Sequence, residues 1–178
     1  MPTTPSLTTE PTPEPTSAGP HRRPDRRTDL LALVAAVGLA FWVTSGMWRD
    51  PNGRAITVNS GDQALFEWLL AYGAHALTHG DNPLFTHLIN VPDGVNLAVN
   101  TSITVYAVVF APLTYLIGPP ATFLVILTGN LAASALAWYW LLSRHLLRTA
   151  PAALLGGLVI GFSPSLVSHA NAHLNWSA

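Results

Sequence analysis

Apolar runs long enough to cross a lipid bilayer constrain this 178-residue chain more than any other feature. The first run, Leu30–Trp48, has 19 residues and no charged side chain. As a helix rising about 1.5 Å per residue it would be about 28 Å long, which matches the hydrocarbon core of a membrane. Three more apolar stretches cover residues 102–118, 121–142 and 150–167. Because 49% of the residues are hydrophobic and 10% are charged, the sequence predicts an all-α, polytopic membrane protein.

Residues 1–28 are rich in proline, threonine and serine. Such a segment cannot bury enough apolar surface to offset the entropy of ordering, so we expect a disordered tail. Four arginines precede the first run: Arg22, Arg23, Arg26 and Arg27. By the positive-inside rule they predict a cytoplasmic N-terminus in an integral plasma-membrane protein. The run is longer than the apolar part of a signal peptide and no small-residue cleavage site follows it, so it should remain as an anchor.

The number of crossings depends on residues 102–118. If all four stretches cross, the eight arginines divide into four inside and four outside. If residues 102–118 lie in the outer interface or re-enter, the division is six inside and two outside. The positive-inside rule then favours three crossings, and Pro112 together with Gly118-Pro119-Pro120 fits a broken, shallow helix. Four crossings remain the alternative.

With three crossings, residues 49–120 form one long extracytoplasmic loop, and loops of that length are usually functional. Ser60 and Gln63 have the spacing of a capping box, and Asp62 suits the positive end of a helix dipole. Apolar residues then recur at helical spacing: Leu65, Phe66, Leu69, Leu70, Tyr72, Ala76 and Leu77. Polar residues (Gln63, Glu67 and Thr78) form the other side. The pattern predicts an amphipathic helix over residues 62–79 that lies on the membrane surface.

That helix should end near His79-Gly80, because Gly80 is a favoured cap and Asn82-Pro83 stops a helix. The following residues, 81–101, are predicted to be an irregular connection with a turn at Pro92-Asp93-Gly94. Asn130 lies in the middle of a predicted span, where an amide generally bonds to a neighbouring helix.

Several short motifs in this order resemble the GT-C class of polytopic glycosyltransferases, in particular actinobacterial-type members. They are Gly61-Asp62-Gln63, His75 to Leu84 (HALTHGDNPL), Pro92 to Leu97 (PDGVNL), Asn100-Thr101-Ser102, and Gly161-Phe162-Ser163-Pro164 continuing to His169 and His173-Leu174-Asn175. The resemblance covers roughly residues 30–176. It implies transfer of a sugar from a polyprenyl-phosphate donor to an acceptor on the outer face, by a protein whose partners are membrane lipids and the donor rather than nucleic acid.

The resemblance also implies a role for Asp62, as catalytic general base or as a ligand of a divalent metal bound to the donor phosphate. An acceptor hydroxyl needs a proton acceptor nearby, and a hard cation such as Mg or Mn prefers carboxylate oxygens. The alternative is that Asp62 only satisfies the helix dipole. Glu67 follows five residues later, about 500 degrees around a helix, so it is expected to be a solvated residue on another face.

In this class a second acid often follows the third span, but here that stretch contains His169, His173 and Asn175 and no acid. The two histidines are four apart and would share a helix face, where they could bind substrate, phosphate or a metal. They could equally be polar residues at the end of a span. His79 and His75 have the same spacing, but without the glutamate of a His-Glu-x-x-His motif they are expected to be polar residues near a helix end.

The class has more spans than this sequence provides, so we expect residues 29–178 to be the N-terminal part of a larger enzyme, inactive without its C-terminal part or a partner subunit. Two other classes are considered. A small non-enzymatic membrane subunit would pack against a partner, and a transporter fragment would use residues 102–118 as a re-entrant helix. Transporters with inverted repeats place polar groups at mid-membrane, whereas the acids here cluster outside the predicted spans.

Overall fold

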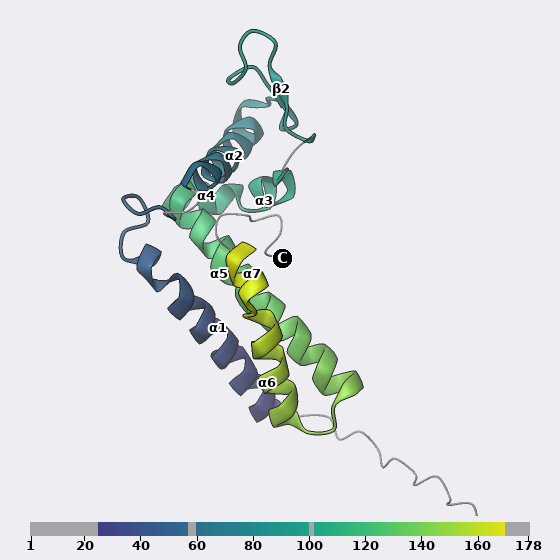
Figure 1. Ribbon diagram of the computed structural model, residues 1–178. Coiled ribbons are helices and arrows are strands. Elements are labelled where there is room, and N and C mark those ends of the chain that lie inside the picture. The colour runs from purple at the N-terminus through teal and green to yellow at the C-terminus, as the bar shows by residue number, and fades with distance from the viewer. Residues whose placement is uncertain (1–24, 57–59, 100–101, 170–178) are drawn as a thin grey trace, which may run out of the picture.

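The computed structural model describes residues 25–56, 60–99 and 102–169, which are mostly helical (Figure 1). The helices are α1 (Arg26–Trp48), α2 (Ser60–His79), α3 (Thr104–Val109), α4 (Ala111–Ile117), α5 (Pro119–Leu141), the π-helical turn η1 (Leu142–Leu146), α6 (Ala150–Gly161) and α7 (Pro164–His169). Two short strands, β1 (Phe85–Thr86) and β2 (Val95–Asn96), pair antiparallel with Phe85 opposite Asn96. Residues 81–101, predicted to be irregular, therefore contain a small hairpin.

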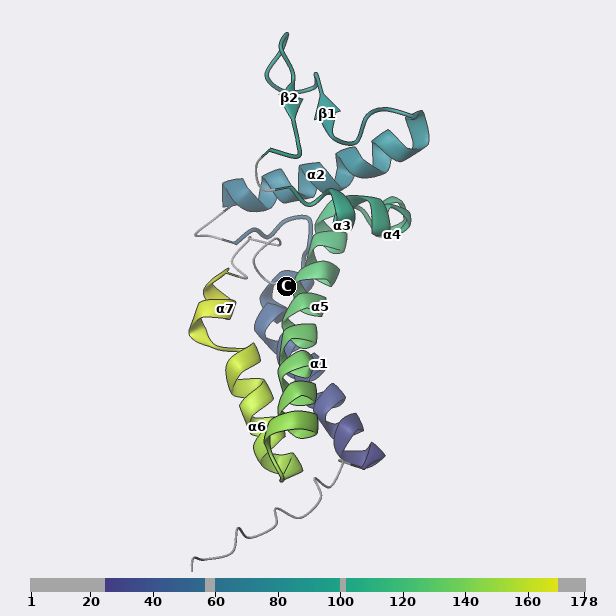
Figure 2. The same ribbon diagram turned by 90° about the vertical axis from the view of Figure 1, so that its right-hand side faces the viewer.

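Helices α1, α5 and α6 lie side by side and form an elongated bundle (Figures 1 and 2). Helix α2 lies across one end of this bundle together with α3 and α4, and the β1–β2 hairpin projects beyond it. The start of α1 and the connection from α5 to α6 lie at the opposite end. Three helical segments of the described residues are long and apolar enough to cross a membrane: Arg26–Trp48, Pro119–Leu146 and Ala150–Ser168. The prediction of membrane-spanning helices is thereby confirmed at the level of length and composition.

The first helix begins before the apolar run. The Asp25 carboxylate accepts a hydrogen bond of 2.9 Å from the backbone N–H of Thr28 and so caps α1. An N-terminal cap of this kind satisfies a donor that has no partner within the helix. Residues 26–28, predicted as part of the tail, therefore belong to the first turn of α1. The rest of the predicted tail, residues 1–24, lies outside the described residues.

Residues 102–118 form two short helices, α3 and α4, that pack against α2. The break falls at Phe110 rather than at Pro112. Pro112 lies in the first turn of α4, where a proline costs no helical hydrogen bond. Gly118, with a φ of 84°, then ends α4, and the prolines that follow open α5. In the described structure neither α3 nor α4 is long enough to span a bilayer.

Small residues allow α5 and α6 to approach closely. Gly157 and Gly161, four positions apart, face Ala135 and Tyr139 of α5. A Cβ atom built on Gly161 would lie 2.6 Å from the Cβ of Ala135, and one on Gly157 would lie 2.8 Å from the Cβ of Tyr139. Glycines at this spacing are a common device for packing helices in membranes. The predicted span 150–167 is itself interrupted after Gly161, just before Pro164.

Polar side chains join α5 to two neighbouring helices. The Thr44 hydroxyl of α1 lies 3.0 Å from that of Thr128, and the Trp48 indole N–H donates to both hydroxyls. Tyr106 of α3 donates a hydrogen bond of 3.3 Å to the Asn130 side-chain oxygen. The prediction that Asn130 bonds to a neighbouring helix is therefore confirmed.

Helix α2 packs its apolar residues into the core of the protein. Phe66 and Leu70 are fully buried and belong to the same cluster as Phe123 of α5. Gly73 touches Ala107 of α3, where a Cβ atom would collide with the side chain of that alanine. Leu65 and Leu77, predicted beside the apolar face, are 40% and 50% exposed because the neighbouring helices cover a different sector of α2.

Candidate functional site

Asp62 lies in the first turn of α2, as predicted, and its side chain is half-buried. The helix begins two positions earlier, at Ser60, so its free backbone N–H groups point toward this end. The positive end of the helix dipole favours a carboxylate there. Asp62 is therefore placed at the end of the bundle where α2 crosses it (Figure 2).

Gln63 departs from the sequence prediction. It is only 4% exposed, although it was assigned to the polar side of the helix. Its side-chain oxygen accepts a hydrogen bond of 2.8 Å from the backbone N–H of Ile56, and its amide nitrogen donates one of 2.7 Å to Glu67. The side chain thus ties the segment after α1 to α2 instead of closing a capping box with Ser60. Glu67, predicted to be solvated, is half-buried because it accepts this bond.

An apolar pocket lies directly next to this link. It has a volume of about 70 Å³ and is formed between α1, α5 and α7. Its lining residues are Val43, Thr44, Met47, Ile56, Leu127, Leu131 and Val167. Ile56, which lines the pocket, is bonded to the residue that follows Asp62. The start of α2 is thereby tied to one wall of the apolar pocket through a hydrogen bond of Gln63.

The carboxylates near Asp62 do not form a metal cluster. Within the part of the chain that the structure describes, no three His, Cys, Asp or Glu side chains gather closely enough to hold an ion. A magnesium ion, however, often uses one or two protein carboxylates and completes its shell with water and substrate phosphate. A site of that second kind at Asp62 stays a prediction. Asp62 and Glu67 are held apart by the helix register, and Glu67 is engaged by Gln63.

His79 lies at the other end of α2, far from Asp62. The two residues are 17 positions apart on one continuous helix, which corresponds to about 25 Å. His79 is exposed, and its ring stacks on that of His75 with centroids 3.9 Å apart. His75 Nε2 in turn lies 3.3 Å from a carboxylate oxygen of Asp81. The structure therefore does not bring His79 and Asp62 into one site.

The remaining predicted site residues fall at the end of the described chain. Helix α7 ends at His169, whose side chain lies outside the described residues, as do His173 and Asn175 entirely. Helix α7 itself lies beneath the N-terminal half of α2 in both views (Figures 1 and 2).

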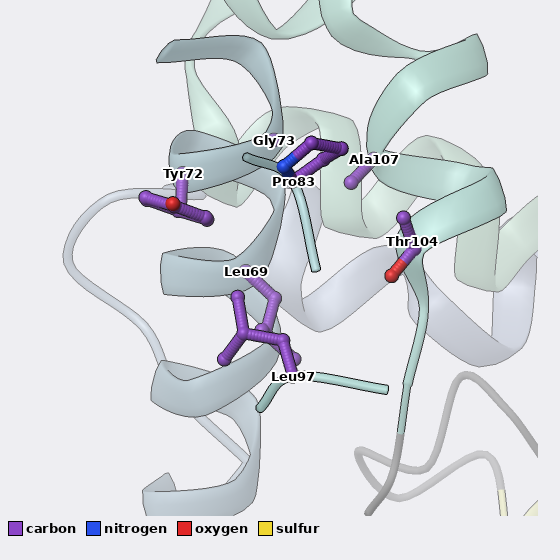
Figure 3. Close-up of a pocket in the computed structure, with 7 residues that line it drawn as sticks. All are labelled: Leu69, Tyr72, Gly73, Pro83, Leu97, Thr104 and Ala107. Atoms are coloured by element: carbon purple, nitrogen blue, oxygen red, sulfur yellow. The ribbon is translucent and has the colours of Figure 1, made fainter. Parts of the chain in front are cut away.

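A second enclosed space, between α2, α3 and the residues around the hairpin, is too small for a substrate. Figure 3 shows it surrounded by Leu69, Tyr72, Gly73, Pro83, Leu97, Thr104 and Ala107. Its volume of about 10 Å³ is no more than the room needed for one water molecule. We interpret this space as a packing gap.

Two features of this structure were missed from the sequence. The buried role of Gln63 was one, and its spacing of four from Glu67 is the signal that could have indicated a side-chain bond. The other is Asp29, in the first turn of α1, which pairs with Arg144 of η1, directly after α5. An acid so close to an apolar run is a signal in itself, because charges near a membrane span are generally paired.

Comparison of the chain with protein-family models, with curated proteins and with solved structures found no match.

Proposed function

We propose that this protein acts in membrane glycosyl transfer of the GT-C kind, with a polyprenyl-phosphate sugar as donor and Asp62 as the acid at the reaction site. The observation that supports the proposal is the bond of Gln63, the residue after Asp62, to the backbone N–H of Ile56, which lines the apolar pocket. A lipid-phosphate sugar has an apolar chain and a charged, polar headgroup. In this proposal the headgroup lies at the start of α2, where Asp62 is, and the first part of the apolar chain enters the pocket.

The bundle supports the same proposal. If its three long apolar segments cross the membrane, the arrangement in Figure 2 leaves α2, α3, α4 and the hairpin together on one side. Arg144 pairs with Asp29 at the other end, next to Arg26 and Arg27. Under the positive-inside rule this end is cytoplasmic, and Asp62 then faces the outside, where the donor headgroup is exposed.

In this proposal Asp62 either accepts the proton of the acceptor hydroxyl or binds a divalent cation shared with the donor phosphate. General-base catalysis is worth about 10² to 10⁴ in rate. A bound Mg or Mn ion would supply charge neutralisation of the phosphate leaving group. Gln63 positions the start of α2 relative to the pocket, because its bond to Ile56 fixes how the segment after α1 meets the helix.

Sugar transfer in native membranes tests the proposal. Membranes that contain the protein together with its C-terminal part or partner subunit, with or without Asp62→Asn, are supplied with radioactive mannosyl and arabinosyl polyprenyl phosphates. The variant is expected to lower transfer to endogenous acceptors by about 10² or more. Asp50→Asn is the matched control, because Asp50 is an exposed acid that follows α1 and its bond to Gly53 N–H can be kept by an amide oxygen. Equal transfer by Asp62→Asn and by the natural sequence would contradict the catalytic role.

Photocrosslinking tests lipid binding separately. A polyprenyl phosphate with a photoreactive group in its first isoprene unit is expected to label Met47, Ile56 or Val167, which line the apolar pocket. Excess polyprenyl phosphate should compete, and an ordinary diacyl phospholipid should not. Labelling spread evenly over the exposed apolar surface of α1 would refute a specific site at the pocket.

A further inference from the structure

A hollow lies at the end of α2 opposite to Asp62. It has a volume of about 390 Å³, within the range of small-molecule sites. The side chains of its wall that matter here are Tyr72, His75, Asp81, Asn82, Phe85 and His87. We name it the histidine hollow. Because His75 is 13 positions from Asp62, the hollow is about 20 Å from the proposed reaction site.

The wall of the histidine hollow is held in place by hydrogen bonds of the protein. The buried Tyr72 hydroxyl lies 2.8 Å from the carbonyl oxygen of Asn82 and 2.9 Å from that of Phe85. Its ring stacks on Trp68 at 5.3 Å between centroids. The loop that follows α2 is therefore fixed against the helix. A preformed wall reduces the entropy that a ligand must overcome on binding.

Several polar groups of the wall remain available to a ligand. The Asn82 side-chain oxygen accepts a bond from Leu84 N–H, which leaves its amide group as a donor. His87 Nδ1 lies 3.1 Å from the Pro92 carbonyl oxygen, so Nδ1 carries the proton and Nε2 is an acceptor when the ring is neutral. His75 engages one carboxylate oxygen of Asp81, and the other can accept.

The lining of the histidine hollow discriminates between classes of ligand. No arginine lines it among the described residues and the chain has no lysine, whereas Asp81 contributes a carboxylate, so an anionic ligand is disfavoured. An apolar ligand would strip water from Asp81, Asn82 and two histidines. Polyhydroxylated rings combine hydrogen-bonding edges with C–H faces that pack on aromatic rings. Such a molecule matches a wall that holds Tyr72 and Phe85 beside amide, carboxylate and imidazole groups.

We propose that the histidine hollow binds a neutral saccharide, as a site separate from the one that contains Asp62. The ligand is a mono- or disaccharide unit of a glycan in the aqueous phase, since the hollow lies beside the hairpin that projects from the bundle (Figure 2). Asp81 and Asn82 bind ring hydroxyls as acceptor and donor. The site holds a glycan at a distance from the reaction site and takes no part in bond making.

Binding by the full chain in lipid nanodiscs, measured by saturation-transfer NMR and calorimetry without any donor, tests this site. Methyl mannoside, methyl arabinoside, mannobiose and cellobiose are the neutral probes. Asp81→Asn and Asn82→Asp are each expected to weaken binding by about tenfold, the value of one hydrogen bond to a charged group. The second variant keeps the oxygen that accepts from Leu84 N–H. Asp93→Asn changes an exposed acid in the same loop and should bind as the natural protein does.

Three results would overturn the saccharide site. They are binding of none of the neutral probes, tighter binding of mannose 6-phosphate or choline than of any neutral probe, and unchanged binding by both Asp81→Asn and Asn82→Asp. Circular dichroism of each variant establishes that the helices are retained. Asp62→Asn should leave saccharide binding unchanged, so failure here and failure of the proposed transferase function give different results.

Discussion

Arg144 donates a hydrogen bond of 2.9 Å to the carboxylate of Asp29, a residue 115 positions earlier in the chain. The other oxygen of that carboxylate accepts a bond of 2.8 Å from Tyr139. These contacts join the start of α1 to the end of α5. They also place Arg144 at the end of the bundle where α1 begins.

The Asp29–Arg144 pair is expected to stabilise the bundle. Both side chains are partly exposed, 23% for Arg144 and 38% for Asp29, so we expect a coupling of about 1 kcal/mol rather than the larger value of a fully buried pair. Denaturation of the natural protein, Arg144→Ala, Asp29→Asn and the double variant in one detergent gives this coupling. Arg148→Ala, at an exposed position in the same connection, is the control. Additive effects of the two single changes would show that the pair contributes nothing.

The proposed topology can be tested directly, because the chain contains no cysteine. Single cysteines at Asn52 and Asp93 are expected to react with a membrane-impermeant maleimide in intact cells. A cysteine at Arg148 should react only after the membrane is opened. Arg148 is a better position than Ser143, which is 6% exposed and would react slowly on either side. Labelling of Arg148→Cys in intact cells would exclude three crossings.

The close approach of α5 and α6 predicts a strong effect of small substitutions. Gly161→Ala places a methyl group against the backbone and Cβ of Ala135. Because backbone atoms cannot shift as easily as a flexible side chain, we expect the free energy of unfolding to fall by about 1 to 3 kcal/mol. Gly129→Ala is the matched control on α5, because no atom lies within 4 Å of the added Cβ. Denaturation in detergent compares the two. A Gly161→Ala protein as stable as Gly129→Ala would mean that α6 packs elsewhere in the membrane.

The buried Gln63 link should be visible in hydrogen exchange. Gln63→Leu removes the acceptor of the Ile56 amide, which costs about 1 to 3 kcal/mol locally, and the Ile56 amide should exchange faster. Gln63→Glu retains an acceptor for that amide although it places a second carboxylate near Glu67. Protection of Ile56 should therefore survive in the glutamate variant. Equal protection in both variants would show that another group holds this amide.

The sequence predicted the long helices well because their signals are local. Apolar length indicated four stretches, and the distribution of arginines together with the Pro and Gly residues near 112–118 distinguished the broken helix from the three segments that could cross a membrane. The position of the break, at Phe110, was not predicted, because a proline such as Pro112 suits the first turn of the helix that follows a break. The start of α1 was placed late because Asp25 caps the helix with a side chain that the apolar pattern does not reveal.

The candidate site was harder to predict because its contacts join distant segments. Periodicity placed Gln63 on the polar side of α2, but the residue is buried by Ile56, which belongs to the segment before that helix. The pairing of Asp29 with Arg144 and the histidine hollow could not be predicted for the same reason, because both are formed by segments that are separated in the sequence. The position of Asp62 in the first turn of a helix could be predicted because a carboxylate near a helix start is recognisable from the local sequence. Its role as a catalytic acid stays a prediction.

The hydrogen bonds of Thr44 and Trp48 with Thr128, and the ion pair of Asp29 with Arg144, lie near opposite ends of α1. A piston stroke of α1 past α5 by one turn, about 5.4 Å, would break both sets together. Rotation of α1 about its own axis would do the same. We therefore expect α1 and α5 to tilt together rather than to slide past each other.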